Sequence, residues 1–164
     1  IAAGGPVTVT DPAMTRFVMS TAQAADLCCD ALQRAAGGEV FIRKMPSVKL
    51  GVLVRALIAE YAPAVGRDPR KIAAQIIGRR PGETTHEEIM TEEEAPRALE
   101  TGRHYIIKPT FMFRELDYAA AHRGARGCAL RAYTSGRQQL MGMEAIRKFI
   151  RQAGLAGPAK GGQR

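Results

Sequence analysis

Proline and glycine residues divide the sequence into short apolar segments, and this limits the length of every helix and strand. The 164 residues include 17 glycines and 9 prolines. Segments 6–11 and 39–45 are apolar-rich and are each followed by a proline, which is typical of short strands. Segments 21–35 and 50–62 instead repeat apolar residues every three or four positions, as amphipathic helices do. The chain should therefore fold from short elements of both kinds.

The remaining segments add strands and helices without an internal repeat and without a strict strand–helix–strand alternation. Thr91 and the three glutamates after it form a capping box, which predicts the start of a helix. A last amphipathic helix is expected at 143–155. Further strand-like segments lie at 15–19, 71–78, 104–109 and 128–135. The predicted fold class is α/β, with a few short strands, partly parallel, packed by about four helices.

Composition describes a globular chain whose charge is unevenly distributed. Hydrophobic residues make up 46% of the chain, and no apolar stretch approaches the roughly 18 residues of a membrane span. The net charge is +8, and residues 103–164 hold 12 basic but only 3 acidic side chains. The arginines stand singly, without the stacking aromatics that single-strand binders use. We expect no membrane and no nucleic-acid partner; a basic nucleic-acid-binding module is the alternative.

Residue types that serve metal binding, redox chemistry or catalysis are scattered along the chain. The three cysteines form no CxxC pair, and the three histidines lie far apart, so no metal site is expected. Cys28 and Cys29 fall in a helical pattern and are predicted to be buried free thiols. No GxGxxG turn and no Tyr-x-x-x-Lys pair occurs. We expect this chain alone to bind no dinucleotide cofactor and to hold no catalytic residue.

One motif stands out, Arg79-Arg80-Pro81-Gly82-Glu83, which directly follows an apolar strand-like segment. Pro and Gly suffice to make a turn, since Pro fixes φ at the first corner and Gly tolerates a positive φ at the second. The flanking charges then have two interpretations. They are either a solvated turn with a local ion pair, or a clamp for a phosphate and a hydroxyl group.

Four sequence blocks occur in an order that resembles a known family. They are PVTVTDPAMTRFVMSTAQAADL (6–27), GGEVFIRKMPSVKLGVLVRAL (37–57), IIGRRPGETTHEEIMTEEEAPRALETGRHYII (76–107) and YTSGRQQLMGMEAIRKFI (133–150). Together they resemble the C-terminal half of inverting UDP-N-acetylglucosamine 4,6-dehydratases. These enzymes are extended short-chain dehydrogenases/reductases (SDRs) of the polysaccharide-biosynthesis type. The resemblance implies a UDP-sugar-binding part at 1–154, followed by a loose tail at 155–164.

The resemblance also implies what this part of such an enzyme does. The NAD(P)-binding Rossmann half, which holds NADP and the catalytic residues, is absent from this chain. Arg16 would contact the diphosphate of a UDP-sugar substrate, Arg80 would pair with the diphosphate, and Glu83 would accept hydrogen bonds from the ribose hydroxyls. Phe17 and Met19 would line the sugar pocket, although core packing explains both residues equally well.

Several alternatives remain open beside this interpretation. Arg16 could pair only with Asp11, Arg79 is expected to be solvated, and the charges of 86–88 are interpreted as helix N-terminal rather than catalytic. Thr84-Thr85 stand where the family usually has Lys-Leu, which leaves details of the sugar pocket open. The residues are expected to be inert alone and cytoplasmic, and the intact enzyme to be a homo-oligomer. The other candidates are a sister epimerase, a retaining dehydratase, or a remnant without a ligand.

Overall fold

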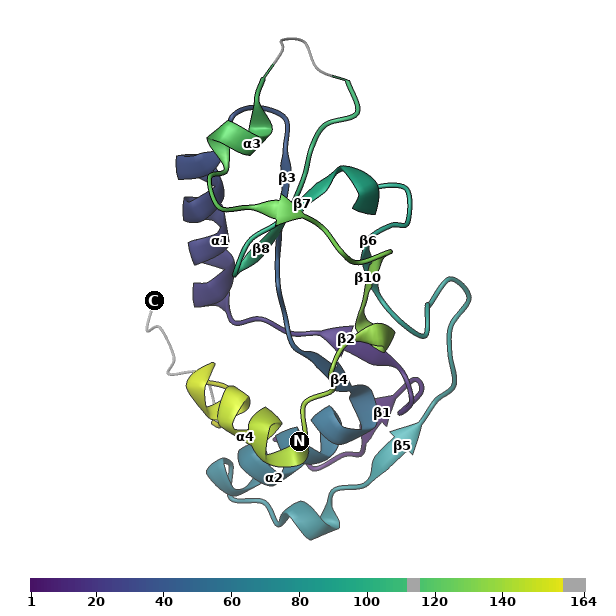
Figure 1. Ribbon diagram of the computed structural model, residues 1–164. Coiled ribbons are helices and arrows are strands. Elements are labelled where there is room, and N and C mark those ends of the chain that lie inside the picture. The colour runs from purple at the N-terminus through teal and green to yellow at the C-terminus, as the bar shows by residue number, and fades with distance from the viewer. Residues whose placement is uncertain (112–115, 158–164) are drawn as a thin grey trace. The chain divides into compact units, whose positions relative to one another are not determined.

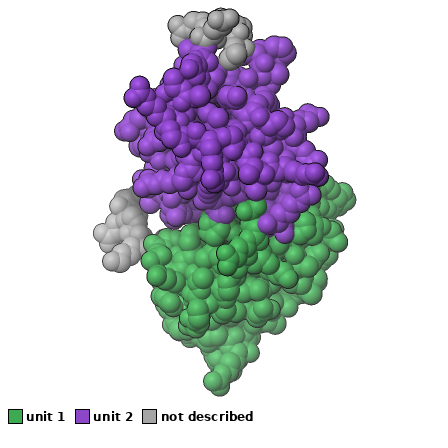
Figure 2. Space-filling view, in the orientation of Figure 1, with its two compact units in different colours: residues 1–18, 46–87, 138–164 green, residues 19–45, 88–137 purple. Residues whose placement is uncertain are grey.

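A computed structural model describes residues 1–111 and 116–157 of the chain. The chain forms two compact units, which Figure 2 shows in green and purple. Unit 1 comprises Ile1–Val18, Pro46–Glu87 and Gln138–Arg164, and unit 2 comprises Met19–Met45 and Glu88–Arg137. Most of the tail expected at 155–164 lies outside the described residues.

Unit 1 combines two helices with two small sheets (Figure 1). Strands β1 and β5 pair in parallel, with Val7 opposite Ala74, whereas β2 and β4 pair antiparallel, with Arg16 opposite Val48. The elements are β1 (Val7–Val9), β2 (Thr15–Phe17), β4 (Ser47–Lys49), α2 (Leu50–Ala64), the 3-10 turn η1 (Pro69–Lys71), β5 (Ala74–Ile76) and α4 (Met143–Gln152).

The apolar faces of α2 and α4 pack on each other and form the core of unit 1. Val48, Ala56, Ile146 and Ile150 are each at most 1% exposed. The predicted periodicity of both helices is therefore confirmed, since burial of one face supplies most of a helix's stability in a protein. Helix α2 runs past its expected end and includes Pro63 in its last turn.

Unit 2 is built on a four-stranded antiparallel sheet in the order β3-β8-β7-β9. Its second strand, β8, is buried at all four positions, as a strand flanked on both sides should be. Helix α1 begins at an N-cap serine, Ser20, whose capping box with Gln23 is complete. The elements are α1 (Thr21–Arg34), β3 (Val40–Arg43), β6 (Glu88–Met90), η2 (Ala95–Arg97), β7 (Ala98–Glu100), β8 (His104–Ile107), α3 (Tyr118–Ala121), β9 (Arg126–Gly127), β10 (Tyr133–Thr134) and η3 (Ser135–Arg137).

The helix predicted to begin at Thr91 does not form. The hydrogen bonds of its capping box do: the Glu94 carboxylate accepts from the Thr91 N–H at 2.9 Å, and the Glu94 N–H donates to the Thr91 hydroxyl at 3.3 Å. The chain then makes only the 3-10 turn η2 before β7 pairs with β8. Pairing in the sheet thus overrides a local helix signal. The strand expected at 128–135 is likewise reduced to the short β10, and β9 lies just before the expected range.

The prediction that Cys28 and Cys29 are buried is wrong. Both thiols are free and exposed, and Cys128 is free and half-buried. Helix α1 contains no buried residue, and Leu32 on its apolar side is 87% exposed. The periodicity predicted the helix correctly, but its apolar face is only partly covered: Ala24 and Leu27 are half-buried, whereas Cys28 and Leu32 are exposed.

Two features of the described residues bear on function. No helix among them is both long and apolar enough to cross a bilayer. They also contain no group of three or more His, Cys, Asp or Glu side chains placed to hold a metal ion.

Candidate functional site

The Arg-Pro-Gly-Glu motif forms the turn that its sequence predicts. The Glu83 N–H donates to the Arg80 carbonyl at 3.1 Å, which closes a four-residue turn. Gly82 has a φ of +84°, the positive value that the third position of a type II turn requires. The Glu83 carboxylate bends back and accepts from the Arg80 N–H at 3.1 Å. The turn is thus closed from both sides of Pro81-Gly82.

The two neighbouring arginines differ in their surroundings. Arg79 pairs with Asp11, with 3.2 Å between Nε and Oδ2, and donates to the Thr85 hydroxyl at 2.6 Å. Arg79 is exposed as expected, with 52% of its side chain accessible, but one side of its guanidinium is also held by these two contacts. Arg80 is exposed, and its guanidinium makes no hydrogen bond or ion pair with the residues that the structure describes.

Arg16, on β2, holds the segment after the turn in place. One terminal nitrogen donates to the Thr15 and Thr85 carbonyls at 2.6 and 3.3 Å, and the other donates to the Thr84 carbonyl at 3.1 Å. Its Nε lies 3.8 Å from Glu87 Oε1. The alternative in which Arg16 pairs with Asp11 is not what the structure shows. In this conformation most of the Arg16 donors face the chain's own acceptors.

The segment after the turn is bonded along β2. The Thr15 N–H donates to the Thr85 carbonyl at 3.0 Å, and the Thr15 hydroxyl lies 2.7 Å from His86 Nδ1. The Phe17 N–H donates to Glu87 Oε2 at 2.7 Å. The sequence suggested that His86 and Glu87 lie at a helix N-terminus, and this interpretation is wrong. Both residues instead connect the loop after the turn to strand β2.

This arrangement suits binding more than catalysis. A guanidinium is permanently charged and can donate two parallel hydrogen bonds to one phosphate or carboxylate. A carboxylate has about four acceptor positions, so Glu83 can still accept from a ligand while it holds the Arg80 N–H. The result is a rigid turn that presents a cation and an acceptor three residues apart.

The other two predicted residues are placed less distinctively. Phe17 ends β2 and is half-buried, and its backbone N–H is the one that Glu87 accepts. Met19 is half-buried and is the first residue of unit 2, so it is described apart from the turn. Two hollows lie among the described residues of unit 2, and neither is lined by any of the five predicted binding residues.

Sequence reasoning missed the supporting residues of the turn. Asp11, His86 and Glu87 act over a separation of about 70 residues, and a single sequence gives no signal for such pairing. The one available hint of this pairing was charge, because acidic residues lie near Arg16 and near Arg79 in the sequence.

The fold is shared with a solved structure of Pen from Bacillus thuringiensis. The TM-score is 0.78 at 33% sequence identity, over 92% of this chain and 42% of Pen. Together with the mixed α/β elements, this supports an α/β fold related to the SDRs. Residues 1–109 match the polysaccharide biosynthesis protein family. The chain belongs to that family.

Two curated relatives extend the comparison. An uncharacterised membrane protein of Methanocaldococcus jannaschii is 46% identical over 106 residues, which are 65% of this chain and 32% of that protein. A UDP-glucose 4-epimerase of Rickettsia akari is 30% identical over 149 residues, which are 90% of this chain and 41% of the epimerase. The chain thus spans well under half the length of these relatives.

Proposed function

We propose that these residues form the UDP-sugar-binding part of an inverting UDP-N-acetylglucosamine 4,6-dehydratase, a cytoplasmic enzyme of nucleotide-sugar and surface-polysaccharide biosynthesis. One observation carries this proposal: of the three arginines at the turn, Arg16 and Arg79 are held by the chain, whereas Arg80 has no side-chain partner among the described residues. An exposed cation on a fixed turn is ready to receive an anion.

In this proposal Arg80 binds the diphosphate of the substrate. Two parallel N–H bonds to phosphate oxygens fix orientation as well as supplying energy. Glu83 accepts hydrogen bonds from the ribose hydroxyls, a role that an acceptor-only carboxylate suits. Arg16 and Arg79 keep the turn in place, and contact between Arg16 and the diphosphate would require it to exchange part of its bonding to the loop carbonyls. Phe17 and Met19 remain candidates for the sugar pocket.

The residues do not fit a dinucleotide cofactor. The glycine-rich strand-to-helix turn that cradles a pyrophosphate is missing from the sequence, as is a Tyr-x-x-x-Lys pair. Removal of a hydride from a hexose needs such a cofactor, so NADP and the catalytic groups would belong to sequence outside these residues. Oligomerisation is likewise proposed for the complete enzyme only.

The second candidate is an epimerase, which the Rickettsia relatives favour by name. The two reactions differ in their products. The complete reading frame that encodes these residues would be expressed and incubated with UDP-N-acetylglucosamine, and the products analysed by mass spectrometry. A product lighter by one water supports the dehydratase, whereas an epimer of unchanged mass supports the epimerase and overturns the dehydratase.

Several basic side chains of residues 103–164 pair with carboxylates of their own unit. Arg126 pairs with Glu100 at 3.5 Å, and Arg137 lies 3.8 Å from Glu92. Arg147 and Arg151 both pair with Glu60. Cations that are paired with carboxylates are less available to a phosphate backbone, which favours a UDP-sugar over nucleic acid as the ligand. Oligonucleotide binding that weakens steeply with salt would favour the nucleic-acid module instead.

A further inference from the structure

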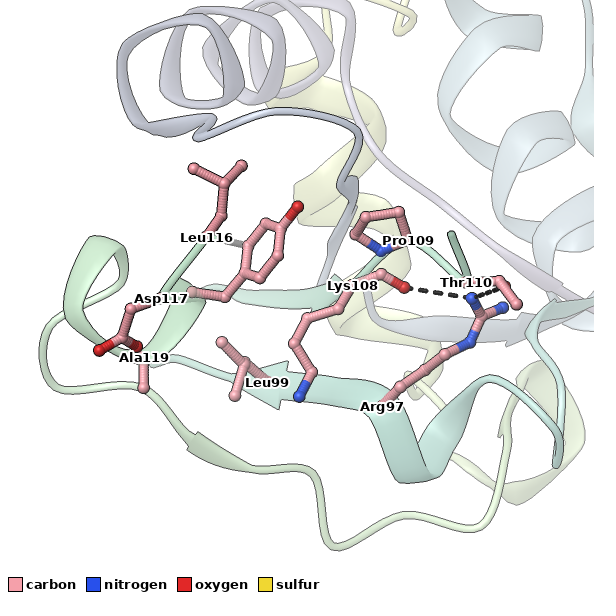
Figure 3. A pocket seen from close by; sticks show the side chains of 9 residues that line it. Arg97, Leu99, Lys108, Pro109, Thr110, Leu116, Asp117 and Ala119 are labelled. Atoms are coloured by element: carbon pink, nitrogen blue, oxygen red, sulfur yellow. Dashed lines mark hydrogen bonds between the residues drawn. The ribbon is translucent and has the colours of Figure 1, made fainter. Parts of the chain in front are cut away.

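Unit 2 contains a hollow of about 490 Å³ beside the middle strands β7 and β8 of its sheet and helix α3. This volume lies within the range of about 300–1,000 Å³ typical of small-molecule sites. Figure 3 shows Arg97 and Thr110 at one end of the hollow, Leu116 and Asp117 at the other, and Lys108 between them. The clamp proposed above uses none of these residues.

Sheet register explains why two cations meet here. Ala98 of β7 is opposite Ile107 of β8, and the Lys108 N–H donates to the Arg97 carbonyl at 3.3 Å, which extends the pairing by one residue. Opposite residues of an antiparallel pair share a face, as do residues two apart on one strand. Arg97, Lys108 and Leu99 therefore share one face. Like charges directly opposite each other are unfavourable, so an anion bound between Arg97 and Lys108 would relieve their repulsion.

The two cations differ in how far the chain satisfies them. The Arg97 guanidinium donates to the Lys108 carbonyl at 3.1 Å and to the Thr110 hydroxyl, and it lies 4.0 Å from Glu94. Lys108 is half-buried, and its ammonium makes no hydrogen bond or ion pair within residues 1–111 and 116–157. Among the described residues, Lys108 is therefore the cation of the lining that has no charged or hydrogen-bonding partner.

The rest of the lining is mainly apolar. Leu99, Pro109, Leu116, Tyr118 and Ala119 contribute to the walls. The Tyr118 hydroxyl donates to the Gly37 carbonyl at 2.8 Å, so its ring is fixed. The one acid of the lining, Asp117, accepts from the Ala120 N–H at 3.0 Å at the start of α3. A ligand would therefore meet a cation beside an apolar surface.

We propose that this hollow binds a small amphiphilic anion, with the anionic group against Lys108 and Arg97 and an apolar or aromatic body against the Leu99 side. Burial of the body supplies affinity in proportion to its area, and the charge-assisted contact to Lys108 supplies orientation. Either feature alone would make a weaker site.

The proposal is tested with the ¹⁵N-labelled 164-residue chain by NMR titration, with phenyl phosphate as the probe. Inorganic phosphate and phenol serve as probes for the charge and the ring alone. With phenyl phosphate we expect saturable chemical-shift changes at Leu99, Lys108 and Ala119. The dissociation constants of the other two compounds should be several-fold larger. Lys108→Gln should weaken the binding of phenyl phosphate about fivefold or more. Lys148→Gln, an exposed lysine on α4, should not.

Four outcomes would overturn the proposal. Equal binding of inorganic phosphate would mean a general cationic surface, and equal binding of phenol would mean an apolar hollow without an anion site. Phenyl phosphate shifts that are absent, or that are equally weakened by Lys148→Gln, would remove the site. The spectra of both variants also report whether each remains folded, so a loss of binding can be separated from a loss of structure.

Discussion

The backbone N–H of Phe17 donates a hydrogen bond to the carboxylate of Glu87, with 2.7 Å between the nitrogen and Oε2. This bond joins two motif blocks that are 70 residues apart in the sequence. Glu87 also lies 3.8 Å from the Arg16 guanidinium on the same strand. The carboxylate thus holds the Arg-Pro-Gly-Glu turn through the loop that follows it.

Removal of the Glu87 carboxylate should destabilise the chain. We expect Glu87→Ala to lower the free energy of unfolding by about 1–2 kcal/mol, because the part-buried Phe17 N–H loses its acceptor. Glu87→Gln should cost less, because its amide oxygen can still accept. Urea denaturation measures the difference. Glu88→Ala, an exposed neighbour, is the control, and an equal loss in that variant would show that Glu87 has no special role.

The positive φ of Gly82 predicts a second stability effect. Gly82→Ala should lower the free energy of unfolding by about 1 kcal/mol, because a side chain in the left-handed region is strained. No atom lies within 4 Å of the Cβ position, so the cost is conformational and not steric. Gly102→Ala is the matched control, since Gly102 also has open space around it but no positive φ. Equal thermal unfolding of the two variants would contradict the assigned turn.

The ion pair between Asp11 and Arg79 should be measurable in a double-mutant cycle. Partly exposed pairs of this kind contribute about 0.2–1 kcal/mol. We expect Arg79→Ala and Asp11→Asn each to destabilise the chain, and the double variant to cost less than the sum of the two. Strict additivity of the three unfolding free energies would mean that the pair does not couple.

Glu60 predicts a dependence of stability on pH. The hydrogen bond from Arg147 lowers the pKa of this carboxyl below its usual value of 4.5, and Arg151 adds to the effect. Because the folded-state pKa lies below the unfolded-state value, the stabilisation is complete above about pH 4.5 and is lost as pH falls through the folded-state pKa. Urea denaturation between pH 6 and pH 3 should show that the free energy of unfolding falls less in Glu60→Gln than in the parent chain. Identical pH profiles would contradict this assignment.

Local chemistry explains which features the sequence predicted. The turn at Pro81-Gly82 and the periodicity of α2 depend on neighbouring residues only, and both are confirmed. The helix expected after Thr91 was equally local, but pairing of β7 with β8 overrode it. A local signal therefore predicts hydrogen bonds better than it predicts the element that follows them.

Long-range contacts explain what the sequence could not predict. Nothing near Arg79 in the sequence indicates Asp11, and nothing near Arg16 indicates the carbonyls of Thr84 and Thr85. Both arginines could be recognised as charged but not as anchored. The family resemblance identified the motif blocks, and their assembly required the structure. The binding roles of Arg16, Phe17, Met19, Arg80 and Glu83 remain predictions.

The measurement that tests the clamp most directly is calorimetric titration of UDP into the protein of the complete reading frame, compared for Arg80→Ala and Arg79→Ala. We expect Arg80→Ala to weaken UDP binding by about 2–4 kcal/mol, because a charge-assisted phosphate contact is lost. The free energy of unfolding should stay nearly unchanged. Arg79→Ala should lower stability and weaken UDP much less. Equal weakening by both variants, or unchanged UDP affinity in Arg80→Ala, would contradict the account.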